Sequence, residues 1–257
     1  MKVIILCGGL GTRLREETEY RPKPMVPVGG QPILWHIMKT YAQHGFTDFV
    51  LCLGYKGEVI KDYFRNYLWN RSDVTLKLGQ NPQITYHKSH EEEDWTVTLL
   101  ETGQSTQTGG RVLRAMHHIG DEDVLMTYGD GLTDANISDV VAFHYAQKAQ
   151  ATLTAVQPAG RFGELGLDGV TIESFQEKPE QEAGFINGGF MVLDKSVRDT
   201  LKGDDCIFER EPLQSIARAG RLRAFKHQGF WQCMDTYREF EILNKMWDAG
   251  EAPWKIW

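Results

Sequence analysis

A glycine-rich stretch near the N-terminus has the residue types of a phosphate-binding loop. The apolar run 3–6 leads into Gly-Gly-Leu-Gly-Thr-Arg-Leu at 8–14, and Pro-Lys-Pro-Met follows at 22–25. Glycines let the chain turn sharply after a strand, and they let backbone N–H groups approach a phosphate without a Cβ in the way. Arg13 adds a planar, permanently charged fork, and Lys23 adds a compact second charge. Together these features indicate a clamp for a nucleoside triphosphate.

Two commoner phosphate loops do not match this stretch. A Walker A loop needs Gly-Lys-Ser/Thr after four spacer residues, and the chain has no such sequence. A dinucleotide fingerprint read from Gly9 needs glycine or alanine at its sixth position, where Leu14 stands. A purely structural turn is the alternative for the glycines alone, and the spacing of Arg13 and Lys23 counts against it.

Two aspartates far apart in the chain have the setting of metal ligands. Asp130 lies between two glycines after the apolar run 124–128, and an aspartate at the carboxyl end of a parallel strand lies where open α/β sheets bind ligands. Asp235 precedes Thr236 and Glu239, which have the spacing of a capping box. Mg²⁺ prefers one or two carboxylates plus phosphate oxygens. The alternatives are a turn cap for Asp130 and helix-end electrostatics for Asp235.

For two further polar stretches, the residue types alone leave two alternative functions open. Residues 101–111 form a polar, glycine-bearing loop before a helix, which is either a linker capped by Thr108 or a loop that reads the edge of a nucleobase. Glu177 and Lys178 stand side by side before a proline. Such a pair could accept hydrogen bonds from sugar hydroxyls and hold a sugar phosphate, although it is usually just surface.

The elements that must position these residues alternate between strand and helix. Apolar runs at 3–6, 49–53, 124–128 and 151–156 predict buried strands, and helical spacing follows Pro32, with Gly45 as the stop. This order predicts a Rossmann-like, doubly wound α/β fold with a mostly parallel sheet and right-handed crossovers. Segments 84–87 and 95–99 alternate like strands around a charged link, which predicts a β-hairpin excursion on the surface. Residues 185–193 read as one strand with two glycines inside it.

Composition excludes several classes of protein. The chain has 257 residues, enough for one large domain, and no linker-like stretch divides it. A net charge of −7 argues against a nonspecific nucleic-acid binder, so anionic substrates need a local cluster of cations. Four widely spaced cysteines favour a reducing cytosol. No apolar run approaches the ~20 residues that cross a bilayer, so we expect no membrane partner.

The motifs taken together resemble one family, the sugar-1-phosphate nucleotidyltransferases. The resemblance rests on the two N-terminal motifs and on later motifs similar to the glucose-1-phosphate cytidylyltransferase branch, and it runs from Leu6 to Thr236. It implies Mg²⁺-dependent transfer of CMP from CTP to α-D-glucose 1-phosphate, which gives CDP-glucose and pyrophosphate for deoxysugar or surface-polysaccharide precursors. It also implies a single domain over 1–257, with a sugar-binding part at about 150–236 and a C-terminal helix and tail at about 236–257.

The resemblance assigns roles to individual residues. The catalytic residues would be Arg13, Lys23, Asp130 and Asp235, with the two aspartates on Mg²⁺. The residues that would contact the nucleotide are Leu6, Cys7, Gly8, Gly9, Leu10, Gly11, Thr12, Arg13, Lys23, Ser105, Thr106, Gly110, Arg111 and Gly129. The residues that would contact the sugar phosphate are Glu177, Lys178, Asn187 and Gly188.

Three alternative functions are weighed against this one. The same reaction could use UTP or dTTP or another sugar 1-phosphate, because relatives share the phosphate machinery. An NAD-dependent oxidoreductase is weakened by Leu14, and a sugar-nucleotide sensor would be expected to lose Lys23, Asp130 or Asp235. We further expect a cytoplasmic homo-oligomer, with six subunits by resemblance. The aromatic tail 252–257 is expected to pack on the chain's own core or on another subunit.

Overall fold

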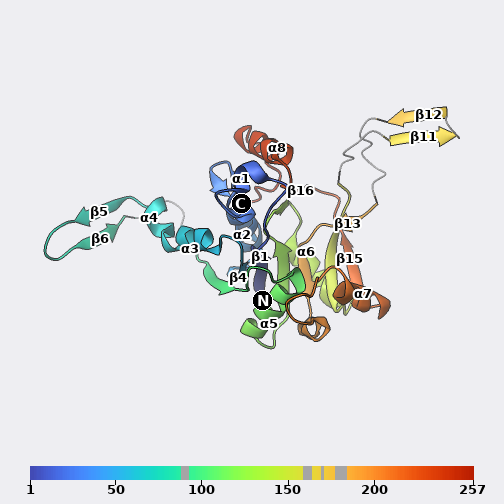
Figure 1. The fold of residues 1–257 in the computed structure, drawn as a ribbon, viewed down its shortest axis with the longest axis horizontal. Helices are drawn as coiled ribbons and strands as arrows, with labels where there is room; N and C mark the ends of the chain where they lie inside the picture. Colours follow the sequence, from blue (N-terminus) through green and yellow to red (C-terminus); the bar gives the residue numbers. More distant parts are fainter. Residues whose placement is uncertain (88–92, 159–163, 169–170, 177–183) are drawn as a thin grey trace.

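A mixed sheet of eight strands forms the centre of the computed structural model, which describes residues 1–87, 93–158, 164–168, 171–176 and 184–257 (Figure 1). The strand order is β13-β10-β14-β8-β1-β4-β7, and β15 pairs with β10. The parallel neighbours on one side are β7 (Thr96–Glu101), β4 (Asp48–Leu53), β1 (Lys2–Leu6) and β8 (Val124–Tyr128). The other side holds β14 (Met191–Leu193), β10 (Ala151–Val156), β13 (Ile186–Asn187) and β15 (Leu222–Lys226). Here β14 is antiparallel to both β8 and β10, whereas β15 is parallel to β10.

Helices cover both faces of this sheet, so the doubly wound, mostly parallel fold is confirmed. Val3 and Ile5 of β1 belong to one apolar cluster, whereas Ile4 and Leu6 belong to a second cluster on the opposite face. A strand buried on both faces needs a continuous apolar run, which is what β1 has. The first cluster contains residues of α2 (Ile33–Gln43), α3 (Gly57–Arg65), α6 (Ile137–Ala146) and α8 (Tyr237–Asp248). The second contains residues of α5 (Thr108–Ile119), η2 (Lys195–Thr200) and α7 (Glu211–Arg218).

The helix ends predicted from capping residues are found in the structure. Helix α2 begins directly after Pro32, and Gly45 follows its C-cap with a φ of +81°, as predicted for the stop. The predicted capping box is present at the start of α8, where Thr236 and Glu239 exchange hydrogen bonds. Helix α3 ends at Arg65, and after its C-cap Asn66 the short helix α4 (Tyr67–Arg71) follows.

The surface hairpin exists, but the predicted pairing of its strands is wrong. It joins β5 (Val74–Lys77) to β6 (Gln83–Tyr86), and Figure 1 shows it extending from the body beyond α4. Strand β7 instead lies parallel to β4 at the edge of the main sheet. Its alternating Val97 and Leu99 pack against the core, which favours the sheet over an exposed hairpin. No buried face marks β5 in the sequence, because its residues are mostly exposed.

The single strand predicted over 185–193 is also corrected. The structure has two short strands, β13 and β14, with a bend between them at Gly188, Gly189 and Phe190. Gly189 and Phe190 both have positive φ, +77° and +46°. A Cβ on Gly188 would lie 2.9 Å from a Val156 methyl and 3.0 Å from the Thr154 carbonyl oxygen, so close backbone approach requires glycine there.

Short elements complete the fold around the sheet. A two-stranded ladder of β9 (Gly131–Thr133) and β16 (Trp231–Cys233) connects the end of β8 to the start of α8. The remaining elements are α1 (Arg15–Thr18), η1 (Lys23–Met25), β2 (Pro27–Val28), β3 (Gln31–Pro32), β11 (Glu164–Asp168) and β12 (Thr171–Gln176). Among the described residues, no helix combines the length and the apolar character needed to cross a membrane.

Candidate active site

The ladder between β9 and β16 brings the two predicted metal ligands together. Gly131 pairs with Cys233, and the Met234 N–H donates to the Asp130 carbonyl at 2.9 Å. Asp130 therefore lies just before one strand of this ladder, and Asp235 lies just after the other. The two aspartates are 105 positions apart in the sequence, and only the folded sheet makes them neighbours.

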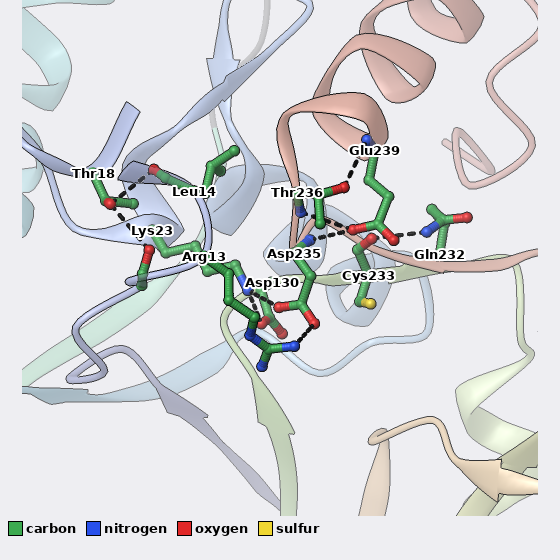
Figure 2. Close-up of polar contacts among 11 residues, drawn as sticks. Arg13, Leu14, Thr18, Lys23, Asp130, Gln232, Cys233, Asp235, Thr236 and Glu239 are labelled. Atoms are coloured by element: carbon green, nitrogen blue, oxygen red, sulfur yellow. Dashed lines mark hydrogen bonds and ion pairs between the residues drawn. The ribbon is translucent and has the colours of Figure 1, made fainter. Parts of the chain in front are cut away.

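Lys23 lies between the two carboxylates, as Figure 2 shows. Its ammonium nitrogen is 2.6 Å from Oδ2 of Asp130 and 2.5 Å from Oδ1 of Asp235. A guanidinium nitrogen of Arg13 lies 2.6 Å from the other Asp235 carboxylate oxygen. Burial alone would lower the pKa of Lys23, but the charges and hydrogen bonds of Asp130 and Asp235 outweigh burial and raise that pKa. The four residues predicted to be catalytic thus form one connected cluster of charges.

A rigid turn holds Lys23 in this place. Residues 23–25 form η1, in which the Met25 N–H donates to the Pro22 carbonyl at 2.8 Å. Pro24 and Met25 are buried and anchor the turn. A Cβ on Gly129 would lie 2.7 Å from the Pro24 ring and 2.9 Å from the Leu6 carbonyl oxygen. Glycine before Asp130 therefore lets this turn approach the end of β8.

A cavity of about 580 Å³ opens above these charges. Its walls are the glycine loop, the turn at Lys23, the loop before α5, and the end of β8. The lining residues are Leu6, Cys7, Gly8, Gly9, Leu10, Gly11, Thr12, Arg13, Lys23, Pro24, Gln104, Ser105, Thr106, Gln107, Thr108, Arg111, Tyr128, Gly129, Asp130 and Asp235. Every residue predicted to contact the nucleotide is among them except Gly110. The structure therefore gathers three separate sequence motifs around one space.

Arg111 lies beneath the glycine loop. Its guanidinium donates to the carbonyl oxygens of Leu53 at 2.9 Å and Gly8 at 3.2 Å, and to the Thr102 hydroxyl at 2.7 Å. Burial lowers the pKa of this guanidinium. A Cβ on Gly8 would lie 2.2 Å from the Arg111 side chain, so the loop can cover the guanidinium only with glycine there. Arg111 consequently supports the loop from below, in addition to the nucleotide contact predicted for it.

The first turn of α5 is closed by a distant backbone segment. The linker alternative placed the cap at Thr108, but Thr108 is the first residue of the helix, and the N-cap Gln107 makes no side-chain capping bond. The N–H groups of Gln107 and Gly109 donate to the Asp204 and Cys206 carbonyls, both at 2.8 Å. The Gly110 N–H also donates to Cys206, at 3.3 Å. These contacts fix the loop that leads into the cavity.

The residues predicted for the sugar phosphate are placed only in part. Glu177 and Lys178 lie outside the described residues. Asn187 and Gly188 are not among the residues lining the cavity as described, but the Asn187 amide donates to the Tyr128 hydroxyl at 3.5 Å, and Tyr128 lines the cavity. Sequence reasoning missed Tyr128 as a wall residue, because it ends a run of buried strand residues and carries no motif of its own.

The donor set is suited to a metal that takes most of its ligands from substrate and water. Among the residues that the structure describes, no group of three or more His, Cys, Asp and Glu side chains could hold a metal ion. Asp130 and Asp235 do converge on one cation, the Lys23 ammonium. Two carboxylates with no further protein ligands match Mg²⁺, which is bound through one or two carboxylates plus phosphates.

Comparison with known proteins identifies the family of this chain. The family model described as nucleotidyl transferase matches residues 2–231. The glucose-1-phosphate cytidylyltransferase of Salmonella typhi is 51% identical over the full length of both chains, and the probable glucose-1-phosphate cytidylyltransferase of Bacillus subtilis (strain 168) is 44% identical, also over both full lengths. The solved structure of HddC from Yersinia pseudotuberculosis shares the fold, with a TM-score of 0.69 at 23% identity over 96% of this chain and 99% of that one. The chain belongs to the nucleotidyl transferase family.

Proposed function

We propose that this chain transfers CMP from CTP to α-D-glucose 1-phosphate, giving CDP-glucose and pyrophosphate. The observation that carries the proposal is the convergence of the glycine loop, Arg13, Lys23 and two aspartates on one cavity. The names of the full-length relatives supply the substrate pair. Both reactants are anions, so positioning and charge neutralisation must carry the catalysis.

The chain's own residues have defined tasks in this reaction. A phosphate oxygen of the sugar phosphate attacks the α-phosphorus of CTP, a new P–O bond forms, and the bond to the bridging oxygen breaks, so pyrophosphate leaves. The glycine loop and Arg13 bind the departing phosphates, and Lys23 neutralises charge at the α-phosphate. The attack needs no covalent intermediate on the protein.

We infer that a divalent metal, Mg²⁺ in this proposal, completes the site. Asp130 and Asp235 would hold it, and when bound it would neutralise charge on the α-phosphate and on the leaving pyrophosphate. Lys23 holds the two carboxylates together, which supports this place for the cation. Without this ammonium, two neighbouring negative charges would repel each other.

The contacts to the base and the sugar remain part of the proposal. Ser105, Thr106, Gly110 and Arg111 would read the cytosine and ribose. The sugar phosphate would bind Glu177, Lys178, Asn187 and Gly188, in a sugar-binding part at about 150–236 of a single domain over 1–257. A site that hydrogen-bonds the amino group of cytosine discriminates strongly, because another base leaves buried polar groups unpaired.

Pyrophosphate release from every combination of nucleoside triphosphate and sugar 1-phosphate tests this function. We expect the highest kcat/KM with CTP and glucose 1-phosphate, and loss of release when the divalent metal is chelated. A preference for UTP or dTTP would keep the reaction class and overturn the choice of base. Binding of CDP-glucose without any pyrophosphate release would instead identify a sugar-nucleotide sensor.

We also propose that copies of this chain assemble into a homo-oligomer, with six subunits, in the cytoplasm. The hairpin of β5 and β6 supports assembly, because it extends from the body (Figure 1) and exposes Leu76, Leu78, Ile84 and Tyr86, with 84% of Leu78 exposed. A lone two-stranded hairpin is marginally stable in water, so a second copy would stabilise it. The aromatic tail gives no such argument, since Trp254 is fully buried in the chain's own core. All four cysteines are free, which fits a reducing compartment.

Light-scattering mass of the full chain tests this assembly. We expect six times the 29.3 kDa subunit mass for the wild type, and a smaller species for Leu78→Ser combined with Ile84→Ser. Tyr145→Ser, which removes an exposed aromatic ring from α6, is the matched control and should keep the wild-type mass. A monomeric wild type at micromolar concentration would contradict the proposal.

A further inference from the structure

The Glu209 carboxylate connects two residues that line the cavity from separate segments, Thr108 and Tyr128. One of its carboxylate oxygens accepts a hydrogen bond from the Thr108 hydroxyl at 2.7 Å, and the other accepts one from the Tyr128 hydroxyl at 2.6 Å. These lengths are typical of hydroxyl groups that donate to an ionised carboxylate, which are among the strong hydrogen bonds of proteins. Thr108 and Tyr128 both line the cavity, whereas Glu209 is not among its lining residues as described.

Tyr128 extends this connection toward the segment predicted to bind the sugar. The Tyr128 hydroxyl donates its one hydrogen bond to Glu209, and its oxygen can still accept another. The phenol oxygen then accepts a hydrogen bond from the Asn187 side-chain amide at 3.5 Å. The Asn187 carbonyl oxygen accepts from the Gly189 N–H at 2.9 Å. The Asn187 amide is therefore oriented by two contacts, the Gly189 N–H and the hydroxyl that Glu209 holds.

Thr108 anchors the other end of the connection. Its hydroxyl oxygen also accepts a hydrogen bond from the Phe208 N–H at 2.9 Å, so both its donor and its acceptor roles are used by the segment around Glu209. The same segment supplies the carbonyls that close the first turn of α5. The loop before α5 is thus held by the segment that carries Glu209, and its place in the cavity follows from that contact.

We propose that Glu209 is a positioning residue that aligns the nucleotide wall of the cavity with its sugar wall. The inference rests on the proposed function. Glu209 acts through Thr108 on the loop predicted to read the base, and through Tyr128 on Asn187, and it makes no contact with substrate itself. An anionic side chain is tolerated beside two anionic substrates because hydroxyl donors satisfy both of its oxygens. Loss of Glu209 should therefore weaken binding of both substrates together.

Steady-state kinetics of Glu209→Gln test this role. The variant keeps the shape of the side chain, but its single carbonyl oxygen accepts from only one hydroxyl, and the other bond is lost. We expect KM to rise for CTP and for glucose 1-phosphate, with kcat/KM lower on the order of 10-fold, in line with the loss of one hydrogen bond to a charged group. The matched control is Glu211→Gln, which removes the same charge two positions away, where the side chain pairs on the surface with Arg218. It should keep wild-type kinetics.

A double-mutant cycle shows whether the effect passes through Tyr128. Tyr128→Phe removes the hydroxyl, and its cost should be smaller in a Glu209→Ala background than in the wild type, because Glu209→Ala removes both hydrogen bonds of the carboxylate, including the one from Tyr128. Additive costs would overturn the proposed connection. Thr108→Val breaks the other bond of Glu209, and it provides the test if Glu209→Gln folds poorly.

The outcomes separate this inference from the proposed function. A wild-type chain without cytidylyl transfer would contradict the proposed function, and this inference with it. An active wild type and a Glu209→Gln variant with a lower melting temperature but unchanged KM values would contradict the inference alone, because a merely structural role changes stability without changing both KM values.

Discussion

Lys23 is the residue on which the charges of the candidate site converge. It reaches one oxygen of Asp130 and one of Asp235, and both side chains come from segments more than 100 positions away. Buried or half-buried carboxylates of like charge cannot both stay ionised without a cation nearby. Lys23 therefore keeps the two aspartates paired, and in the proposed reaction it would also neutralise the substrate phosphate.

Lys23→Ala should lower kcat by about 10²–10³, the usual effect of removing one charge that stabilises a transition state. The variant should also need a higher metal concentration for half-maximal activity, because the two aspartates lose the ammonium that holds them together. Lys61→Ala is the control, since Lys61 forms a surface ion pair with Glu101 and such pairs contribute little. Near-wild-type turnover of Lys23→Ala would remove Lys23 from the mechanism.

At the scale of elements, the glycine loop and the helix behind it form one unit. Arg111 of α5 reaches up to the loop and binds the carbonyls of Leu53 and Gly8. The guanidinium therefore packs against the underside of the loop. The space around the loop glycines differs from one position to the next. Gly8 has no room for a side chain, whereas a Cβ on Gly9 would meet nothing within 4 Å.

Gly8→Ala should destabilise the fold, and Gly9→Ala should not. The new methyl at position 8 would overlap the Arg111 guanidinium, so that cation would have to leave its carbonyl partners. A buried charge that loses its partners costs on the order of 3 kcal/mol or more, which thermal or denaturant unfolding will detect. Gly9→Ala is the matched control, and equal melting temperatures for the two variants would contradict this account of the loop.

At the scale of the whole molecule, the C-terminal tail closes over the start of α2. Trp254 is fully buried, and its indole N–H donates to Nδ1 of His36 at 3.3 Å. The other ring nitrogen of His36 lies 2.8 Å from the Val28 carbonyl oxygen, which can only accept. His36 is therefore neutral, with its proton on Nε2. Protonation would place a second N–H against the Trp254 donor.

Because folding keeps His36 neutral, the free energy of unfolding should fall in mild acid. Burial lowers the pKa of His36 from 6.5 to about 4, so the folded state binds its proton less readily than the unfolded state. The stabilisation is fully present above pH 6.5 and is lost as the pH falls toward 4, for a total of about 3 kcal/mol. Burial lowers the pKa of His44 and His144 in the same direction.

Denaturant unfolding between pH 4 and 8 measures this loss. His36→Gln should show a shallower decline of the free energy of unfolding with falling pH than the wild type. His117→Gln, on the exposed side of α5, is the control and should follow the wild-type curve. Identical pH slopes for His36→Gln and the wild type would exclude His36 as a source of acid sensitivity.

Much of the fold and of the site could be predicted because the signals are local. A continuous apolar run identifies a strand buried on both faces, as in β1, and a capping box identifies the first turn of α8. The glycine loop, Lys23 and the two aspartates were recognisable for the same reason, since residue type and near neighbours define each motif. The hairpin strand β5 gave no such signal, because an exposed strand need not alternate between apolar and polar residues, although its equally exposed partner β6 does.

By itself, the sequence determined the alternation of strands and helices, and it singled out the first glycine loop and four charged residues that the structure gathers around one cavity. Only the tertiary structure decided that β7 belongs to the main sheet, that Arg111 supports the glycine loop, and that Glu209 stands behind two walls of the cavity. These facts depend on contacts between residues from about 50 to more than 100 positions apart. Such contacts arise when the sheet and its helices pack together, and no single stretch of chain encodes them.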